Sequence, residues 1–84
     1  MKPVTVYSTN MCPFCEAAKA LLSKRGVAYE EINFAREPDS RDRLVEKTGG
    51  LTFPQILIGE TNIGGFQELR AADQSGKLAE LLAA

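Results

Sequence analysis

Both cysteines of this 84-residue chain lie in one short segment, Cys12-Pro13-Phe14-Cys15. The segment stands between a run rich in β-branched and aromatic residues and a run of helical periodicity that starts at Cys15. A strand therefore turns into a helix at the cysteines, which is typical of a small α/β chain. A Cys-x-x-Cys at such a junction indicates a thiol–disulfide redox site.

The rest of the chain predicts an α/β fold with the element order β-α-β-α-β-β-α-α. A helix joins the first two strands, so we expect these strands to be parallel neighbours. The last two strands form a hairpin, so a mixed four-stranded sheet flanked by helices follows. We expect one domain over residues 1–84, with Gly49 and Gly50 ending the second helix. The predicted elements are a strand over Pro3–Ser8, a helix from Pro13 and Cys15 to Arg25, a strand over Val27–Asn33 that Phe34 extends, a helix from Pro38–Ser40 to about Lys47, a strand over Gln55–Ile58, a return strand at Asn62–Ile63, and helices over Phe66–Asp73 and Lys77–Leu82.

The composition narrows the possible functions. A formal net charge of -1 gives no electrostatic reason to expect a nucleic acid or a membrane as partner. We find no apolar run long enough to cross a bilayer and no charged-then-apolar leader, so we expect a cytoplasmic protein. The chain has two cysteines and no histidine, whereas a tetrahedral zinc site needs four ligands. We therefore expect no metal site.

The spacing of the two cysteines predicts different roles for them. The thiolate is the nucleophile in disulfide exchange, and a site at a helix N-terminus lowers the pKa of a thiol from roughly 8.5 to about 3.5–7.5. Cys12 stands at such a position, with Lys19 as a second possible source of positive charge. Cys15 lies one helical turn further on and faces inward, so it is the resolving thiol. Pro13 keeps the segment rigid and Phe14 places an apolar ring beside the sulfur. The alternative is a buried structural pair or half of a metal site shared between two subunits.

Three spaced motifs resemble those of the glutaredoxins, small dithiol members of the thioredoxin fold. Cys12-Pro13-Phe14-Cys15 is similar to their C-P-Y-C, and Thr52-Phe53-Pro54 is similar to their T-V-P, in which the proline is cis. The segment Gly64–Leu69, with the sequence GGFQEL, resembles their G-G-[aromatic or Cys]-[polar]-[acidic]-L. The resemblance covers essentially the whole chain. It implies a thioredoxin-like fold, no bound cofactor, and glutathione as co-substrate.

The resemblance also implies where glutathione binds. The backbone of Phe53 would pair with the extended thiol peptide, and Pro54 would lie against the Cys12 sulfur. Backbone N–H groups at Phe66 and Gln67 would hold the α-carboxylate of the γ-glutamyl residue. Pro13, Phe14 and Pro54 would support the active site. The full implied set of glutathione-binding residues is Cys12, Phe14, Thr52, Phe53, Pro54, Gly65, Phe66 and Gln67.

The function predicted from these observations is a glutathione-dependent thiol–disulfide oxidoreductase. It would act as a monomer on protein disulfides and glutathione mixed disulfides. Thr9 and Leu51 stand where many glutaredoxins carry Lys and Arg, which leaves a redoxin reduced by thioredoxin reductase as an alternative. An iron–sulfur cluster carrier bridging two subunits with glutathione is a third possibility. Members with that role usually have a C-G-F-S site, from which Pro13 and Cys15 depart.

Overall fold

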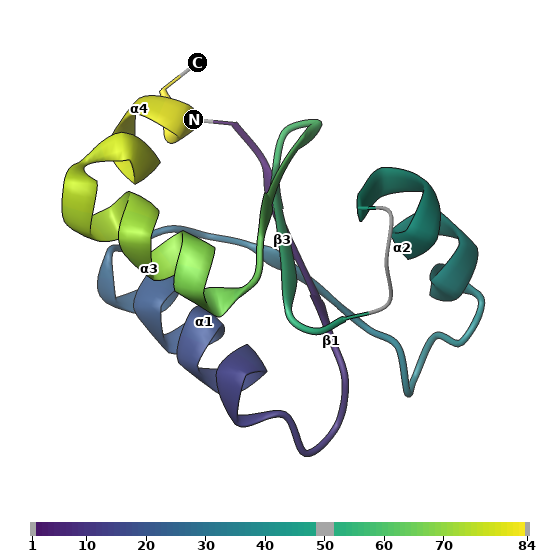
Figure 1. The fold of residues 1–84 in the computed structure, drawn as a ribbon. Coiled ribbons are helices and arrows are strands. Elements are labelled where there is room, and N and C mark those ends of the chain that lie inside the picture. Colours follow the sequence, from purple (N-terminus) through teal and green to yellow (C-terminus); the bar gives the residue numbers. More distant parts are fainter. Residues whose placement is uncertain (1, 49–51, 84) are drawn as a thin grey trace.

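The computed structural model describes residues 2–48 and 52–83, and its elements follow the predicted order (Figure 1). The mixed sheet flanked by helices is confirmed. No helix within the described ranges is both long and apolar enough to span a membrane. The elements are β1 (Val4–Ser8), α1 (Pro13–Lys24), β2 (Glu30–Asn33), α2 (Ser40–Thr48), β3 (Gln55–Ile58), β4 (Thr61–Gly64), α3 (Phe66–Ser75) and α4 (Lys77–Leu82).

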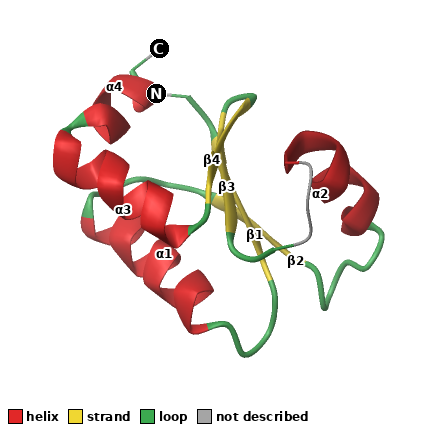
Figure 2. Ribbon diagram, viewed as in Figure 1, coloured by secondary structure: helices red, strands yellow, loops and turns green. Residues whose placement is uncertain are grey.

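The four strands form one sheet in the order β2-β1-β3-β4. β1 and β2 are parallel, and β3 and β4 are antiparallel, as the connections predicted. The structure adds the antiparallel pairing of β1 with β3, which places the middle of the chain beside its start. α1 and α3 cover one face of the sheet, and α2 lies on the other (Figure 2).

Alternating side chains of the strands divide the core into two parts. Val4 and Val6 of β1 point toward α1 and α3, whereas Tyr7 belongs to the cluster on the α2 side. The larger cluster therefore fixes α1 and α3 against the same sheet face. Its buried members are Val4, Val6, Ala18, Leu22, Val27, Ile56, Ile58, Leu69, Ala72, Leu78 and Leu82, and the smaller cluster contains Tyr7, Ile32, Leu44 and Leu57.

Several predicted boundaries were wrong. The second strand begins at Glu30 and not at Val27, because Val27 closes the end of α1: its N–H donates to the Leu22 carbonyl at 2.9 Å. Gly26, with φ +71°, makes this reversal possible.

Phe34 continues the sheet only through one bond from its N–H to the Ser8 carbonyl (2.8 Å), and it lies in a turn. α1 ends at Lys24, α3 continues to Ser75, and β4 runs from Thr61 to Gly64. The predicted stop at Gly49 and Gly50 lies outside the described residues.

Candidate active site

Cys12 and Cys15 lie at the start of α1, on the same side of the sheet as α3. Cys12 is the N-cap residue with an extended backbone, and Pro13 occupies the first helical position, where a missing N–H is tolerated. The two sulfur atoms form a disulfide, with the α-carbons 5.2 Å apart. Cys15 is fully buried, whereas Cys12 is partly exposed. An incoming thiol or disulfide can therefore reach Cys12 but not Cys15.

The Cys12 sulfur also takes the place of a capping oxygen. It accepts a hydrogen bond from the Cys15 backbone N–H at 3.2 Å, the role that a Ser or Asp oxygen usually plays at an N-cap. A thiolate accepts such a bond more strongly than a neutral thiol does, and it also benefits from the positive end of the helix dipole. The local backbone therefore favours the nucleophilic form of Cys12.

A groove of about 270 Å³ lies on the Phe14 side of the disulfide. Its walls come from the start of α1, from the segment before β3, and from the turn between β4 and α3. The rings of Phe14 and Phe66 stack across it, with centroids 6.0 Å apart. Of the residues implied in glutathione binding, all but Cys12 line this groove: Phe14, Thr52, Phe53, Pro54, Gly65, Phe66 and Gln67. The Phe53–Pro54 peptide bond is cis.

The N-terminus of α3 supplies polar groups at one end of the groove. The first hydrogen bond within this helix runs from the Leu69 N–H to the Gly65 carbonyl at 3.0 Å. The N–H groups of Phe66 and Gln67 precede that bond, and Gly65 has no side chain to cap them. The Glu68 carboxylate accepts from the Gly65 N–H at 2.8 Å and forms part of the groove wall.

A second hollow, which we call the polar pocket, borders Cys12 and Pro13 and shares no lining residue with the groove. Its volume is about 560 Å³. It is lined by Thr9, Asn10, Met11, Cys12, Pro13, Glu16, Lys19, Glu31, Asn33 and Arg36. Thr9, one of the two positions at which an expected Lys or Arg is absent, therefore lines this pocket. The other, Leu51, lies outside the described residues.

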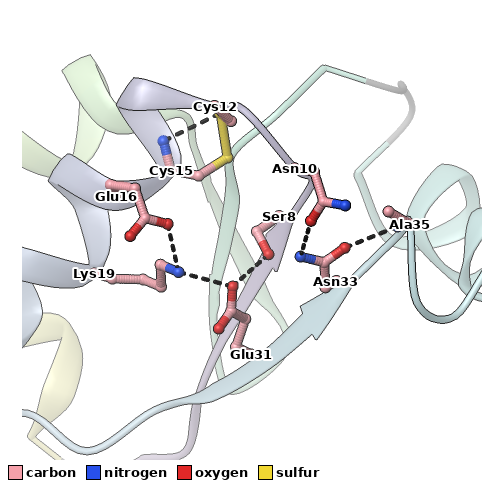
Figure 3. A network of polar contacts seen from close by, with 9 residues as sticks. All are labelled: Ser8, Asn10, Cys12, Cys15, Glu16, Lys19, Glu31, Asn33 and Ala35. Atoms are coloured by element: carbon pink, nitrogen blue, oxygen red, sulfur yellow. Dashed lines mark hydrogen bonds and ion pairs between the residues drawn. A yellow bond between two sulfur atoms is a disulfide. The ribbon is translucent and has the colours of Figure 1, made fainter.

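Lys19, which lines the polar pocket, forms ion pairs with two carboxylates. Its ammonium group lies 2.6 Å from a Glu16 carboxylate oxygen and 3.0 Å from one of Glu31 (Figure 3). The buried Ser8 hydroxyl donates to the same Glu31 oxygen at 2.6 Å. The hydrogen bonds to Glu16 and Glu31 raise the pKa of Lys19, and those from Ser8 and Lys19 lower the pKa of Glu31.

The sequence identified Lys19 but not the partners that share its charge. The pair Glu16 and Lys19 is three residues apart on a helix, which is a recognisable ion-pair spacing. Glu31 and Ser8 are far from Lys19 along the chain, and no local pattern connects them. Among the described residues, no group of three or more His, Cys, Asp or Glu side chains is arranged to hold a metal ion.

Comparison with known proteins identifies the family. The family model described as Glutaredoxin matches residues 4–63. A glutaredoxin of Pseudomonas aeruginosa is 46% identical over 84 residues, which covers the whole of both chains. The chain belongs to the glutaredoxin family. Glutaredoxin 3 of Escherichia coli is 39% identical over 82 residues, covering 98% of this chain and 99% of that protein.

Solved glutaredoxins share the fold as well as the sequence. The glutaredoxin of Brucella melitensis is 41% identical with a TM-score of 0.82, and the match covers 98% of this chain and 89% of that one. A buckwheat glutaredoxin in complex with glutathione is 31% identical with a TM-score of 0.85, covering 96% and 76% of the two chains. Family membership and the paired cysteines make this glutaredoxin a thiol–disulfide oxidoreductase.

Proposed function

We propose that this glutaredoxin uses glutathione to reduce protein disulfides and glutathione mixed disulfides, with Cys12 as nucleophile and Cys15 as resolving thiol. The observation that carries the proposal is the groove beside Phe14. It gathers three segments that are distant in the sequence, and they are the segments that the family motifs assign to glutathione. The buckwheat relative of the same fold has been solved with glutathione, which supports the same ligand here.

The first half of the reaction uses Cys12, the more exposed of the two cysteines. The Cys12 thiolate attacks one sulfur of the substrate disulfide, forms a mixed disulfide with it, and releases the other sulfur as a thiolate that takes up a proton. The Cys15 N–H, 3.2 Å from the Cys12 sulfur, holds the attacking atom at the helix end. When the substrate is a glutathionylated protein, attack on the glutathione sulfur releases the protein thiol.

When the substrate is a protein disulfide, the second half depends on the buried cysteine. A glutathionyl group on Cys12 can instead be removed by a second glutathione thiolate, and the two leave together as oxidised glutathione. Deprotonated Cys15 attacks the Cys12 sulfur of a mixed disulfide, and the bound thiol leaves as the Cys12–Cys15 disulfide forms. Two glutathione molecules then restore the dithiol and leave as oxidised glutathione, so that the two electrons are balanced. Because Cys15 is fully buried, it is protected from direct attack by external disulfides and reacts after Cys12.

The groove offers a place for each part of a glutathionyl group. The free N–H groups of Phe66 and Gln67 suit the γ-glutamyl carboxylate, since an anion is stabilised at a helix N-terminus. The rings of Phe14 and Phe66 provide an apolar wall, and the backbone of Phe53, which lines the groove, would pair with the peptide. Pro54, which has no N–H, would lie against the Cys12 sulfur and offer it no competing donor.

The test is reduction of a glutathione mixed disulfide in a system coupled to NADPH, glutathione and glutathione reductase. We expect Cys12→Ser to abolish turnover. Cys15→Ser is expected to retain reduction of the glutathione mixed disulfide and to lose reduction of protein disulfides that need the dithiol. Activity that survives Cys12→Ser would overturn the assignment of the nucleophile.

A parallel assay with thioredoxin reductase in place of glutathione and its reductase separates the two possible reductants. Turnover with thioredoxin reductase alone would refute the glutathione dependence. Anaerobic reconstitution with iron and sulfide tests the cluster-carrier alternative, which a colourless product would exclude. The client proteins, the monomeric state and the cytoplasmic location stay predictions.

A further inference from the structure

The polar pocket places a charged network beside the reactive cysteine, apart from the groove proposed for glutathione. Cys12 lines the pocket together with Glu16, Lys19 and Glu31. Glu16 is fixed to the cysteine through the backbone, because its N–H donates to the Cys12 carbonyl at 3.2 Å. Glu16 therefore joins the network from a position one helical turn after Cys12.

The network contains two carboxylates, of Glu16 and Glu31, and one ammonium group, of Lys19. Lys19 is mostly buried, with 19% of its side chain exposed, and both of its partners are carboxylates. The Ser8 hydroxyl, itself buried at the end of β1, holds Glu31 in place without adding charge. Two carboxylates and one ammonium group give the network itself a net charge of about -1 near neutral pH, and Arg36, which lines the same pocket, brings the sum of its charged groups to about zero.

We propose that Glu31, with Glu16 and Lys19, is a positioning group that limits how readily the Cys12 thiol ionises. The carboxylates oppose the helix dipole at Cys12, and the positive charges of Lys19 and Arg36 keep that opposition small. The other charged groups around Cys12 are Arg36, from the loop after β2, and Glu68, which lies across the groove on α3. The positive charge of Arg36 also lowers the pKa of Glu31, and both Arg36 and Glu68 are left unaltered in the variants below.

Opposite changes in the network should shift Cys12 in opposite directions. Glu31→Gln keeps the shape and hydrogen bonding of the side chain and removes one negative charge, so the thiolate becomes easier to form. Lys19→Met removes the positive charge and makes the thiolate harder to form. The interaction between two unit charges about 10 Å apart shifts an ionisation equilibrium about two-fold in water. The shift is about four-fold where the effective dielectric constant is half that of water.

The experiment measures thiolate absorbance at about 240 nm against pH in the reduced protein, with Cys15→Ser as background so that one thiol titrates. At a fixed pH below the midpoint, we expect Glu31→Gln to raise the thiolate fraction about two- to four-fold and Lys19→Met to lower it by a similar factor. Both differences should shrink in about 0.5 M salt, because salt screens partly exposed charges.

The matched control is Glu80→Gln, which removes an exposed carboxylate from α4, beside the chain termini (Figure 1). This variant should leave the titration of Cys12 unchanged. If Glu31→Gln and Lys19→Met shift the titration in the same direction, or by no more than the control, the inference is wrong. The inference concerns the Cys12 thiol and uses no glutathione, so it can fail while the proposed glutathione dependence holds, and the reverse.

Discussion

The backbone conformation of Gly64 affects the shape of the groove directly. It ends β4 with φ +114°, a backbone region that residues with a side chain rarely adopt. A β-carbon at this position would lie 2.9 Å from the Glu68 carboxylate oxygen Oε1 and 3.2 Å from Glu68 Cγ. Gly64→Ala must therefore strain the backbone and displace Glu68, whose carboxylate accepts from the Gly65 N–H in the groove.

The expected loss of stability can be worked out from these two effects. A residue with a side chain in such a backbone conformation costs about 1–3 kcal/mol. Loss of the hydrogen bond between Gly65 and Glu68 adds about 0.5–1.5 kcal/mol. Gly64→Ala should therefore destabilise the oxidised protein by about 1.5–4.5 kcal/mol. A chain of this size is expected to have a total stability of roughly 4–13 kcal/mol, so the variant should still fold over most of this range.

Gly26→Ala is the matched control. Gly26 also has a positive φ, +71°, but nothing lies within 4 Å of a β-carbon built there. The change should cost only about 1–2 kcal/mol of backbone strain. Urea unfolding followed by circular dichroism measures both variants. In the glutathione mixed-disulfide assay, Gly64→Ala should raise KM because the groove wall moves, and Gly26→Ala should not. The reasoning is refuted if Gly26→Ala loses as much stability as Gly64→Ala, or raises KM equally.

Three further outcomes are expected. Leu22→Ala, at a fully buried position of α1, should lower the free energy of unfolding by about 3–5 kcal/mol in urea, and a loss below about 1 kcal/mol would contradict the packing. The bonds from Ser8 and Lys19 hold the pKa of Glu31 below its usual 4.5. Ionised Glu31 therefore stabilises the folded protein fully above pH 4.5, and this stabilisation disappears as the pH falls through the lower pKa that Glu31 has in the folded protein. Between about pH 6 and about pH 3, the free energy of unfolding measured in urea should therefore fall less for Ser8→Ala than for the unaltered protein. An equal fall in both proteins would count against the Ser8–Glu31 bond. Phe66→Ala removes the stack on Phe14 and should raise KM for the glutathione mixed disulfide about two- to twelve-fold; an unchanged KM would remove the ring from the site.

The sequence alone determined the order of the elements and the thiol–disulfide chemistry of the pair Cys12 and Cys15. Strands and helices have periodicities of 2 and 3.6 residues, which a local window reveals, and Cys-x-x-Cys is a local motif. The ends of elements were less predictable. Val27 looks like a strand residue, yet its N–H closes α1, because its burial in the larger cluster outweighs its β preference.

Only the tertiary structure decided what surrounds Cys12. The antiparallel pairing of β1 with β3 brings the chain before Gln55 back beside the start of the molecule. The parallel pairing of β1 with β2 sets Ser8 opposite Asn33 and places Glu31 within reach of Ser8 and Lys19. These contacts join residues that are far apart in the chain, and a local pattern carries no information about which distant strands become neighbours. The sequence therefore fixes the two reactive sulfurs, and the sheet order fixes both the groove and the charges that act on them.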